Sequence, residues 1–286
     1  MLNILERLLS ATAWPMTTPS PYSAFHLLLG ALGIGAAAAA ARLLSRRNAV
    51  KPERVLFFCG LFLACSELYK QLFLYFLVNN KTYNWWYFPF QLCSTPMYLC
   101  LIFPFLNHSR RNTAPLRKMT QHAAPEQKPV LSSGTARGIC ATFLQDFGLL
   151  GGFMALSFPE GFLYPYWALT LHGFIWHFLL IFIGLYCFFR GLTDFGEHGF
   201  AKIIPLYAAF CLLATFINTA VQLTVYPASY ADMFYINCFF PSEQPVFHQI
   251  SLALGNGWGH LAYLLASCLG AFFIHHILKF FARKSV

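Results

Sequence analysis

A cysteine and two histidines are the residues of this sequence best suited to covalent chemistry. Cys93 lies in the run WWYFPFQLCSTPMYL at 85–99, and His172 and His177 follow in a later apolar run. A thiolate is a strong nucleophile, and a nearby imidazole can take the proton of the thiol. Such a pair could transfer an acyl group through a thioester, which water or another acceptor would then resolve. Taken alone, Cys93 is more simply interpreted as a small buried residue.

Several polar side chains lie in apolar runs and could bind a substrate beside this pair, because polar groups inside a bilayer are costly and tend to be functional. They are Gln91, Ser94, Glu67, Lys70, Asn218 and Gln222. Gln91, Asn218 or Lys70 would suit the stabilisation of an oxyanion. Glu67 and Lys70 lie three residues apart and share a helix face, so a purely structural ion pair is the alternative. Asn218 and Gln222 could instead hydrogen-bond to neighbouring helices.

The sequence leaves open which histidine would be the base. His172 and His177 are five residues apart, roughly 140° around a helix, so at most one is expected to face the thiol. Cys93 is six residues past Tyr87 and His172 is five past Trp167, so depth favours His172. His177 lies deeper, where apolar neighbours would exclude water.

The composition is that of a membrane protein. Of the 286 residues, 58% are hydrophobic and only 10% are charged, whereas soluble proteins carry about 25% charged residues. The net charge of +9 comes from basic residues in short segments between apolar runs. That pattern indicates membrane topology rather than nucleic-acid binding. The nine cysteines have neither a CxxC motif nor zinc-ligand spacing, so we expect no metal and no cofactor.

The apolar runs predict an all-α, polytopic membrane bundle with about seven transmembrane helices, because a span needs about 20 mostly apolar residues. The whole chain, 1–286, would form a single integral membrane domain. The predicted spans are 22–44, 55–78, 87–106, 139–158, 167–189, 203–225 and 258–281. Between them, 107–138 is expected to be a flexible cytoplasmic loop. The aromatic segment 226–257 is expected to be an outer loop or lid that folds over the bundle.

The basic residues orient the bundle. Sixteen of the 19 lysines and arginines fall on one face, and only Arg7 and Lys81 fall on the other. The positive-inside rule therefore predicts an N-terminus outside and a C-terminus inside, which requires an odd number of spans. In this topology the polar residues of five helices share the outer half of the membrane. Asp146 is the weaker member of that group, because its depth is central or inward.

Four segments carry a resemblance to a known family. The runs SELYKQ, PFQLCSTPMYL, ALTLHGFIWH and FIN resemble the YwaF-like family of bacterial integral membrane proteins, over most of residues 22–281. That family is similar in turn to an animal multi-pass protein described as a cysteine-dependent acyltransferase for ether phospholipids. The resemblance implies a buried Cys–His site that acts on lipid acyl chains. By position, Cys93 would be the nucleophile, and His177 or His172 would be the base; the resemblance favours His177, with His172 as the alternative that depth favours.

Two classes of function follow. The first is a lipid-active acyltransferase or thioesterase-like enzyme of the cell membrane, with membrane lipids as partners and an acyl chain as substrate. The second is a transporter, or a small-ligand or lipid-binding protein, without covalent chemistry; an accessory protein is a third alternative. An enzyme needs Cys93 within hydrogen-bond reach of a histidine, whereas a transporter needs a cavity that opens to both sides. The sequence does not specify the oligomeric state.

Overall fold

The structure is a computed structural model that describes residues 2–106 and 135–284. These residues are mostly helical and contain no regular strand. The α-helices are α1 (Leu2–Ser10), α2 (Ala24–Ser45), α3 (Pro52–Phe73), α4 (Thr95–Ile102), α5 (Ala136–Ser157), α6 (Trp167–Phe189), α7 (Ile204–Thr224), α8 (Phe247–Leu254) and α9 (Asn256–Lys284). The predicted loop at 107–138 lies outside the described residues except for its end, where Thr135 caps α5 by accepting a hydrogen bond from the Gly138 N–H.

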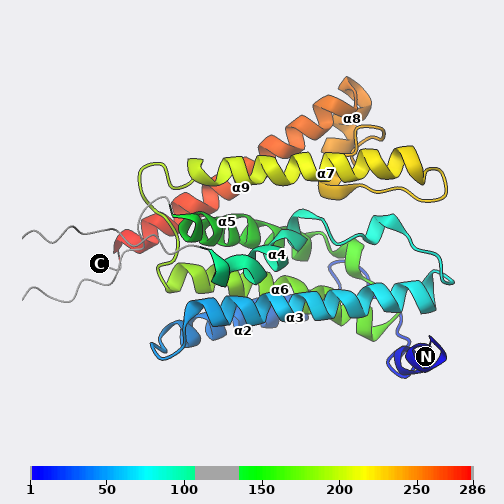
Figure 1. Ribbon diagram of the computed structural model, residues 1–286, viewed down its shortest axis with the longest axis horizontal. Coiled ribbons are helices and arrows are strands. Elements are labelled where there is room, and N and C mark those ends of the chain that lie inside the picture. Colours follow the sequence, from blue (N-terminus) through cyan, green and yellow to red (C-terminus); the bar gives the residue numbers. More distant parts are fainter. Residues whose placement is uncertain (1, 107–134, 285–286) are drawn as a thin grey trace, which may run out of the picture.

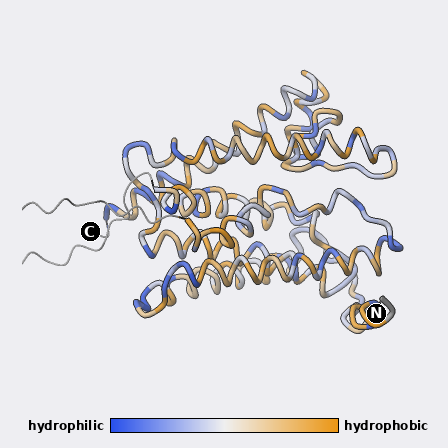
Figure 2. Tube along the Cα trace, viewed as in Figure 1, coloured by the Kyte–Doolittle hydropathy of each residue, from blue (hydrophilic) through white to orange (hydrophobic). Residues whose placement is uncertain are grey.

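Six helices in the described part of the chain are long and apolar enough to cross a membrane. They are α2, α5, α6, α9, α3 with its π-helical extension to Val78, and α7 with the turn before it. Figure 2 shows apolar residues along the bundle, with hydrophilic residues gathered in the loops at its ends. The protein is therefore a multi-pass membrane protein.

The predicted span at 87–106 is built differently from the others. Its regular part is a shorter helix, Leu92–Phe105, made of α4 between two 3-10 turns. Residues 88–91 are not helical, because Pro89 lacks a backbone donor and disfavours the α conformation in the residue before it. The broken segment still packs between α3 and α5. The two chain ends lie at opposite ends of the bundle (Figure 1), as an odd number of passes requires.

The centre of the bundle is the packing of α5 on α6. A Cβ added at Gly152 would lie 2.8 Å from Ile181 Cγ1, and one added at Gly184 would lie 2.6 Å from Leu149 Cγ. These glycines therefore let the two helices approach closely, as small residues do between membrane helices. Helix α6 in turn contacts α2 and α3, while α5 contacts α4 and α9. This frame fixes α6, the helix of both candidate histidines, against the segment that carries Cys93.

Candidate functional site

The first part of the site is a buried ion pair on α3. Lys70 Nζ lies 2.8 Å from Glu67 Oε1, so the pair expected from the three-residue spacing is present. Gln71 Nε2 also donates to Glu67 Oε1, at 2.7 Å, and to the carbonyl of Tyr87. The Glu67 residue is only 4% exposed, whereas the Lys70 side chain keeps 20% of its surface. The cluster thus neutralises a buried carboxylate and ties α3 to the turn that precedes Cys93.

Cys93 is held at the junction of three segments. It lies in the 3-10 turn Leu92–Ser94, directly before α4. Its carbonyl accepts a hydrogen bond from Trp176 Nε1 of α6, at 3.1 Å. On the other side, a Cβ added at Gly151 of α5 would lie 3.6 Å from the Cys93 Cβ, so a larger side chain there would crowd the cysteine. The turn also buries Ser94, whose N–H donates to the carbonyl of Gln91.

The two histidines of α6 differ in their partners. The His177 Nδ1 atom lies 2.7 Å from the carbonyl oxygen of Gly173, and its ring packs against Phe162. If His177 Nδ1 carries the proton, that bond leaves Nε2 as the basic nitrogen. The His172 ring packs against Trp176, with centroids 5.5 Å apart. His172 Nε2 is buried and has no hydrogen-bond partner among the residues that the structure describes.

Cys93 and His172 share one neighbour in the structure. Trp176 contacts both the Cys93 carbonyl and the His172 ring. Lys70 lies close enough to act electrostatically on Cys93, His172 and His177. No hydrogen bond joins the Cys93 sulfur to either imidazole within the described ranges. A catalytic hydrogen bond of this kind often closes only when substrate is bound.

Two of the predicted substrate ligands bind the protein's own backbone instead. Gln91 Nε2 donates to the Asp232 carbonyl and Gln91 Oε1 accepts from the Phe234 N–H, both at 2.8 Å. Asn218 likewise makes two hydrogen bonds to Met233: its Nδ2 donates to the Met233 carbonyl at 3.1 Å, and its Oδ1 accepts from the Met233 N–H at 2.7 Å. Together the two amides clamp 232–234 and satisfy a backbone in which Phe234 has a φ of 59°. Any contact of these two amides with substrate stays a prediction.

The clamped segment is stabilised internally by an aspartate that the sequence analysis did not single out. Asp232 Oδ1 accepts a hydrogen bond from the Asn237 N–H at 2.9 Å, and Asn237 Nδ2 donates to the Ala231 carbonyl. All three residues are buried, and burial raises the pKa of Asp232 to about 7. The segment at 226–257 thus places a compact turn inside the bundle. Asp232 and Asn237, the two polar residues of the otherwise apolar run ADMFYIN, were the sequence feature that could have indicated this turn.

The last predicted ligand, Gln222, lies one helical turn beyond Asn218 on α7. Its Oε1 is buried and has no hydrogen-bond partner in the described part of the chain. Gln222 therefore differs from Asn218, whose amide is fully used.

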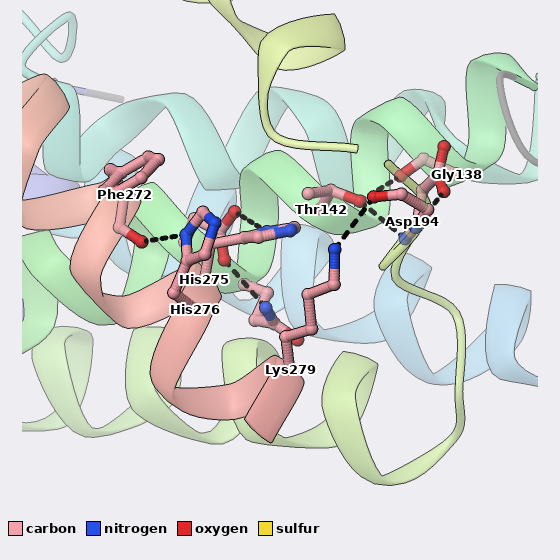
Figure 3. Close-up of polar contacts among 10 residues, drawn as sticks. Gly138, Thr142, Asp194, Phe272, His275, His276 and Lys279 are labelled. Carbon is pink, nitrogen blue, oxygen red and sulfur yellow. Dashed lines mark hydrogen bonds and ion pairs between the residues drawn. The ribbon is translucent and has the colours of Figure 1, made fainter. Parts of the chain in front are cut away.

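A second buried cluster links α5 to α9. His275 Nδ1 lies 2.8 Å from Asp146 Oδ2, and Gln145 Nε2 donates to Asp146 Oδ1 at 2.7 Å. The polar contacts at this end of the bundle continue to Asp194 and Lys279 (Figure 3). Asp146 was expected as a weaker member of the outer polar group, whereas the structure pairs it with His275 of α9. The depth of Asp146 in α5 and of His275 in α9, each about ten residues from the basic end of its helix, was the signal for this pairing.

The described residues contain no group of three or more histidine, cysteine, aspartate or glutamate side chains that could hold a metal ion. The arrangement beside Cys93 instead offers a thiol, an imidazole and an ammonium group. Those groups suffice for acyl transfer through a thioester.

Comparison with known proteins identifies the family. The model of the TMEM164 family matches residues 20–278, which is most of the chain. The chain matches no curated protein and no solved structure. The match supports the expected membrane protein family in its coarser form, and it does not bear on the YwaF-like name or on a bacterial origin. The chain belongs to the TMEM164 family.

Proposed function

We propose that this protein is a lipid-active acyltransferase or thioesterase-like enzyme of the cell membrane, with Cys93 as its nucleophile. The observation that supports this most is the position of Trp176, which binds the Cys93 carbonyl and packs against the His172 ring. One side chain thereby fixes a thiol-bearing turn and a candidate base with an unpartnered nitrogen. The resemblance to the YwaF-like family, which is similar in turn to a cysteine-dependent acyltransferase for ether phospholipids, supports the same chemistry.

In the proposed reaction, the base takes the proton of the Cys93 thiol and the thiolate attacks the carbonyl carbon of a lipid ester. The ester C–O bond breaks, the base returns the proton to the departing lipid oxygen, and the acyl group remains on the sulfur as a thioester. The hydroxyl of a second lipid, or water, then attacks the thioester. Its proton passes to the base and then to the released sulfur, which restores the thiol.

His172 is the first candidate for the base, and His177 is the second. His172 touches the same indole as Cys93 and keeps Nε2 without a partner among the described residues. His177 is oriented by Gly173, with its ring packed in apolar surroundings. Lys70, which pairs with Glu67, is the cation proposed to stabilise the oxyanion of the tetrahedral intermediate.

The test is labelling of the purified protein with an alkyne-tagged 2-bromohexadecanoate, which alkylates a reactive thiol and has a long chain. We expect labelling of the wild type and loss of most of it in Cys93→Ala. Cys65→Ala is the matched control, because Cys65 is an exposed cysteine of α3 outside the site. Loss in Cys65→Ala with labelling retained in Cys93→Ala would contradict the proposal, and a binding protein without covalent chemistry would then be favoured.

Parallel variants assign the base. If His172 activates the thiol, His172→Ala slows labelling at pH 7, and raising the pH restores the rate because hydroxide then generates the thiolate. His177→Ala would then change the rate little. The reverse order would assign the role to His177.

A further inference from the structure

An apolar groove runs along the outside of the bundle between α2, α3 and α6. It has a volume of about 660 Å³. It is lined by Gly33, Ala36, Ala37, Ala40, Leu44, Val55, Phe58, Cys59, Phe62, Ile175, Phe178, Leu179 and Phe182. No charged side chain and no hydroxyl is among these residues. In a multi-pass membrane protein, such a surface is suited to hydrocarbon rather than to a polar ligand.

The groove is shaped by small residues opposite aromatic ones. Helix α2 supplies glycine and alanines, while α3 and α6 supply phenylalanines. The ring of Phe178 lies against the α2 backbone, because a Cβ added at Gly33 would be only 2.0 Å from its Cζ. Along α2 the lining extends from Gly33 to Leu44, about 16 Å at the rise of an α-helix. The groove is thus about half as long as the roughly 30 Å hydrocarbon core is thick, which is long enough for much of an extended acyl chain.

One end of the groove meets the candidate site. Ser66 lies one helical turn beyond Phe62 on α3, and the His172 ring contacts the backbone of Ser66. On α6, His172 precedes Leu179 by seven residues, so the two lie on one helix face. The end of the groove at Phe62 and Ile175 therefore lies about one helical turn from His172, which shares Trp176 with Cys93.

We propose that this groove binds one acyl chain of a membrane phospholipid, with its carbonyl end toward His172 and Cys93 and its methyl end toward Leu44. This inference rests on the proposed function, because only a reacting acyl chain requires its carbonyl at the Cys93 end. The apolar lining selects the chain by length rather than by any polar group. Long-chain esters are therefore the substrate class.

The first test fills the groove. Ala36 and Ala40 line it and are exposed, so the double variant Ala36→Phe/Ala40→Phe fills it without disturbing buried packing. We expect labelling of Cys93 by 2-bromohexadecanoate to slow by about tenfold or more, because several methylenes lose their site. Labelling by iodoacetamide, which has no chain, should change less than about twofold. Ala39→Phe is the control, since Ala39 is an exposed residue of the same helix outside the lining.

Equal slowing of both reagents would show that the filling variant disturbs the site itself, and it would overturn the groove as the chain's path. Slowing in Ala39→Phe as strong as in the double variant would overturn it as well.

The second test identifies what occupies the groove, and in which direction, without relying on the reactivity of Cys93. Phosphatidylcholine with a diazirine near the methyl end of one chain is incorporated into nanodiscs with the protein, irradiated, and the cross-linked peptides are mapped. We expect enrichment at Leu44, Val55 and Phe182 over other lipid-facing positions, and loss of it in the filled variant. With the diazirine near the carbonyl, enrichment should move to Phe62 and Ile175. Enrichment in the opposite order would place the headgroup at the basic end of α2 and overturn the proposal, as would uniform cross-linking.

The Cys93→Ala variant distinguishes the proposed chemistry of Cys93 from the binding of an acyl chain in the groove. If the groove holds the chain, cross-linking persists in Cys93→Ala, because it needs no thiol. An unreactive Cys93 with groove cross-links in the proposed direction would therefore overturn the proposed chemistry alone. A reactive Cys93 with no enrichment in the groove would overturn this inference alone.

Discussion

Two buried pairs of titratable side chains in this bundle show what separates a structural contact from a candidate site. Asp146 and His275 join α5 to α9, are 0% and 1% exposed by side chain, and leave neither carboxylate oxygen unpaired. Glu67 and Lys70 lie within α3, where the Lys70 side chain keeps 20% exposure and acts electrostatically on the Cys93 thiol and on His172, whose Nε2 has no partner among the described residues. A buried charge alone therefore does not mark chemistry. Reactive atoms next to it that the fold leaves unused are the more specific sign.

The largest expected effect is on the α5–α9 pair. Asp146→Ala leaves the fully buried His275 Nδ1 and the Gln145 Nε2 without their hydrogen-bond partner, and each buried group left unsatisfied costs about 1–3 kcal/mol. We expect a clear loss of thermal stability in detergent, while the folded fraction keeps the wild-type rate of Cys93 labelling. A variant that is stable but unreactive would contradict the division between the two clusters.

The α3 pair should show a smaller loss of stability and a larger loss of reactivity. Glu67→Ala leaves the Lys70 ammonium without its partner, but that side chain is partly exposed, so we expect about 2 kcal/mol. Glu67→Ala/Lys70→Ala should be less destabilised than Glu67→Ala, because no unpaired charge remains. Equal losses in the single and double variants would show that the two charges are not coupled. Both variants should label Cys93 more slowly, because each removes or displaces the Lys70 cation.

The amide clamp comes next in size. Gln91→Leu removes two hydrogen bonds to the 232–234 backbone, each worth about 1 kcal/mol. Hydrogen exchange at the Phe234 amide should therefore become faster. Gln222→Leu is the matched control, because Gln222 Oε1 has no partner among the described residues. We expect this variant to leave exchange at the Phe234 amide unchanged. Unchanged exchange in Gln91→Leu would show that the amide does not hold the segment.

The smallest effect is a pH dependence of the same segment. Burial raises the pKa of Asp232 from 3.8 to about 7, so the folded segment binds a proton that the open segment has released. Its stabilisation is therefore greatest in acid and declines as the pH rises through about 7. Between pH 6 and pH 8 we expect a loss of about 1 kcal/mol in the opening free energy. Hydrogen exchange in wild type should speed up accordingly, and Asp232→Asn should remove the pH dependence that remains after correction for the intrinsic exchange rate.

Much of the fold could be predicted from apolar run length. The run 167–189 was predicted as a span, and α6 has those same bounds, because nothing in it interrupts the helix. The run 87–106 passed the same test of hydropathy, yet Pro89 breaks it and the helix begins only after Gln91. The hydropathy of a run does not show where a proline, which lacks a backbone donor, interrupts the helix.

The candidate site was harder to predict, because depth along a helix does not specify a partner. Depth grouped Gln91 with Asn218, but it gave no indication that a buried backbone segment uses both amides. The short spacing on α3 did predict the Glu67–Lys70 pair, since partners on one helix need no knowledge of its neighbours. Pairs between helices, such as Asp146 with His275, depend on which helices pack together.

The most direct test of the central claim is mass spectrometry of Cys93 after incubation with a long-chain phospholipid in nanodiscs. The account predicts an acyl adduct on the Cys93 peptide that hydroxylamine removes, as it does a thioester, and no adduct in Cys93→Ala. Adducts on the exposed thiols of Cys65 and Cys238 should be absent. Turnover of the lipid by Cys93→Ala at the wild-type rate, or adducts on the exposed cysteines with Cys93 unmodified, would contradict it.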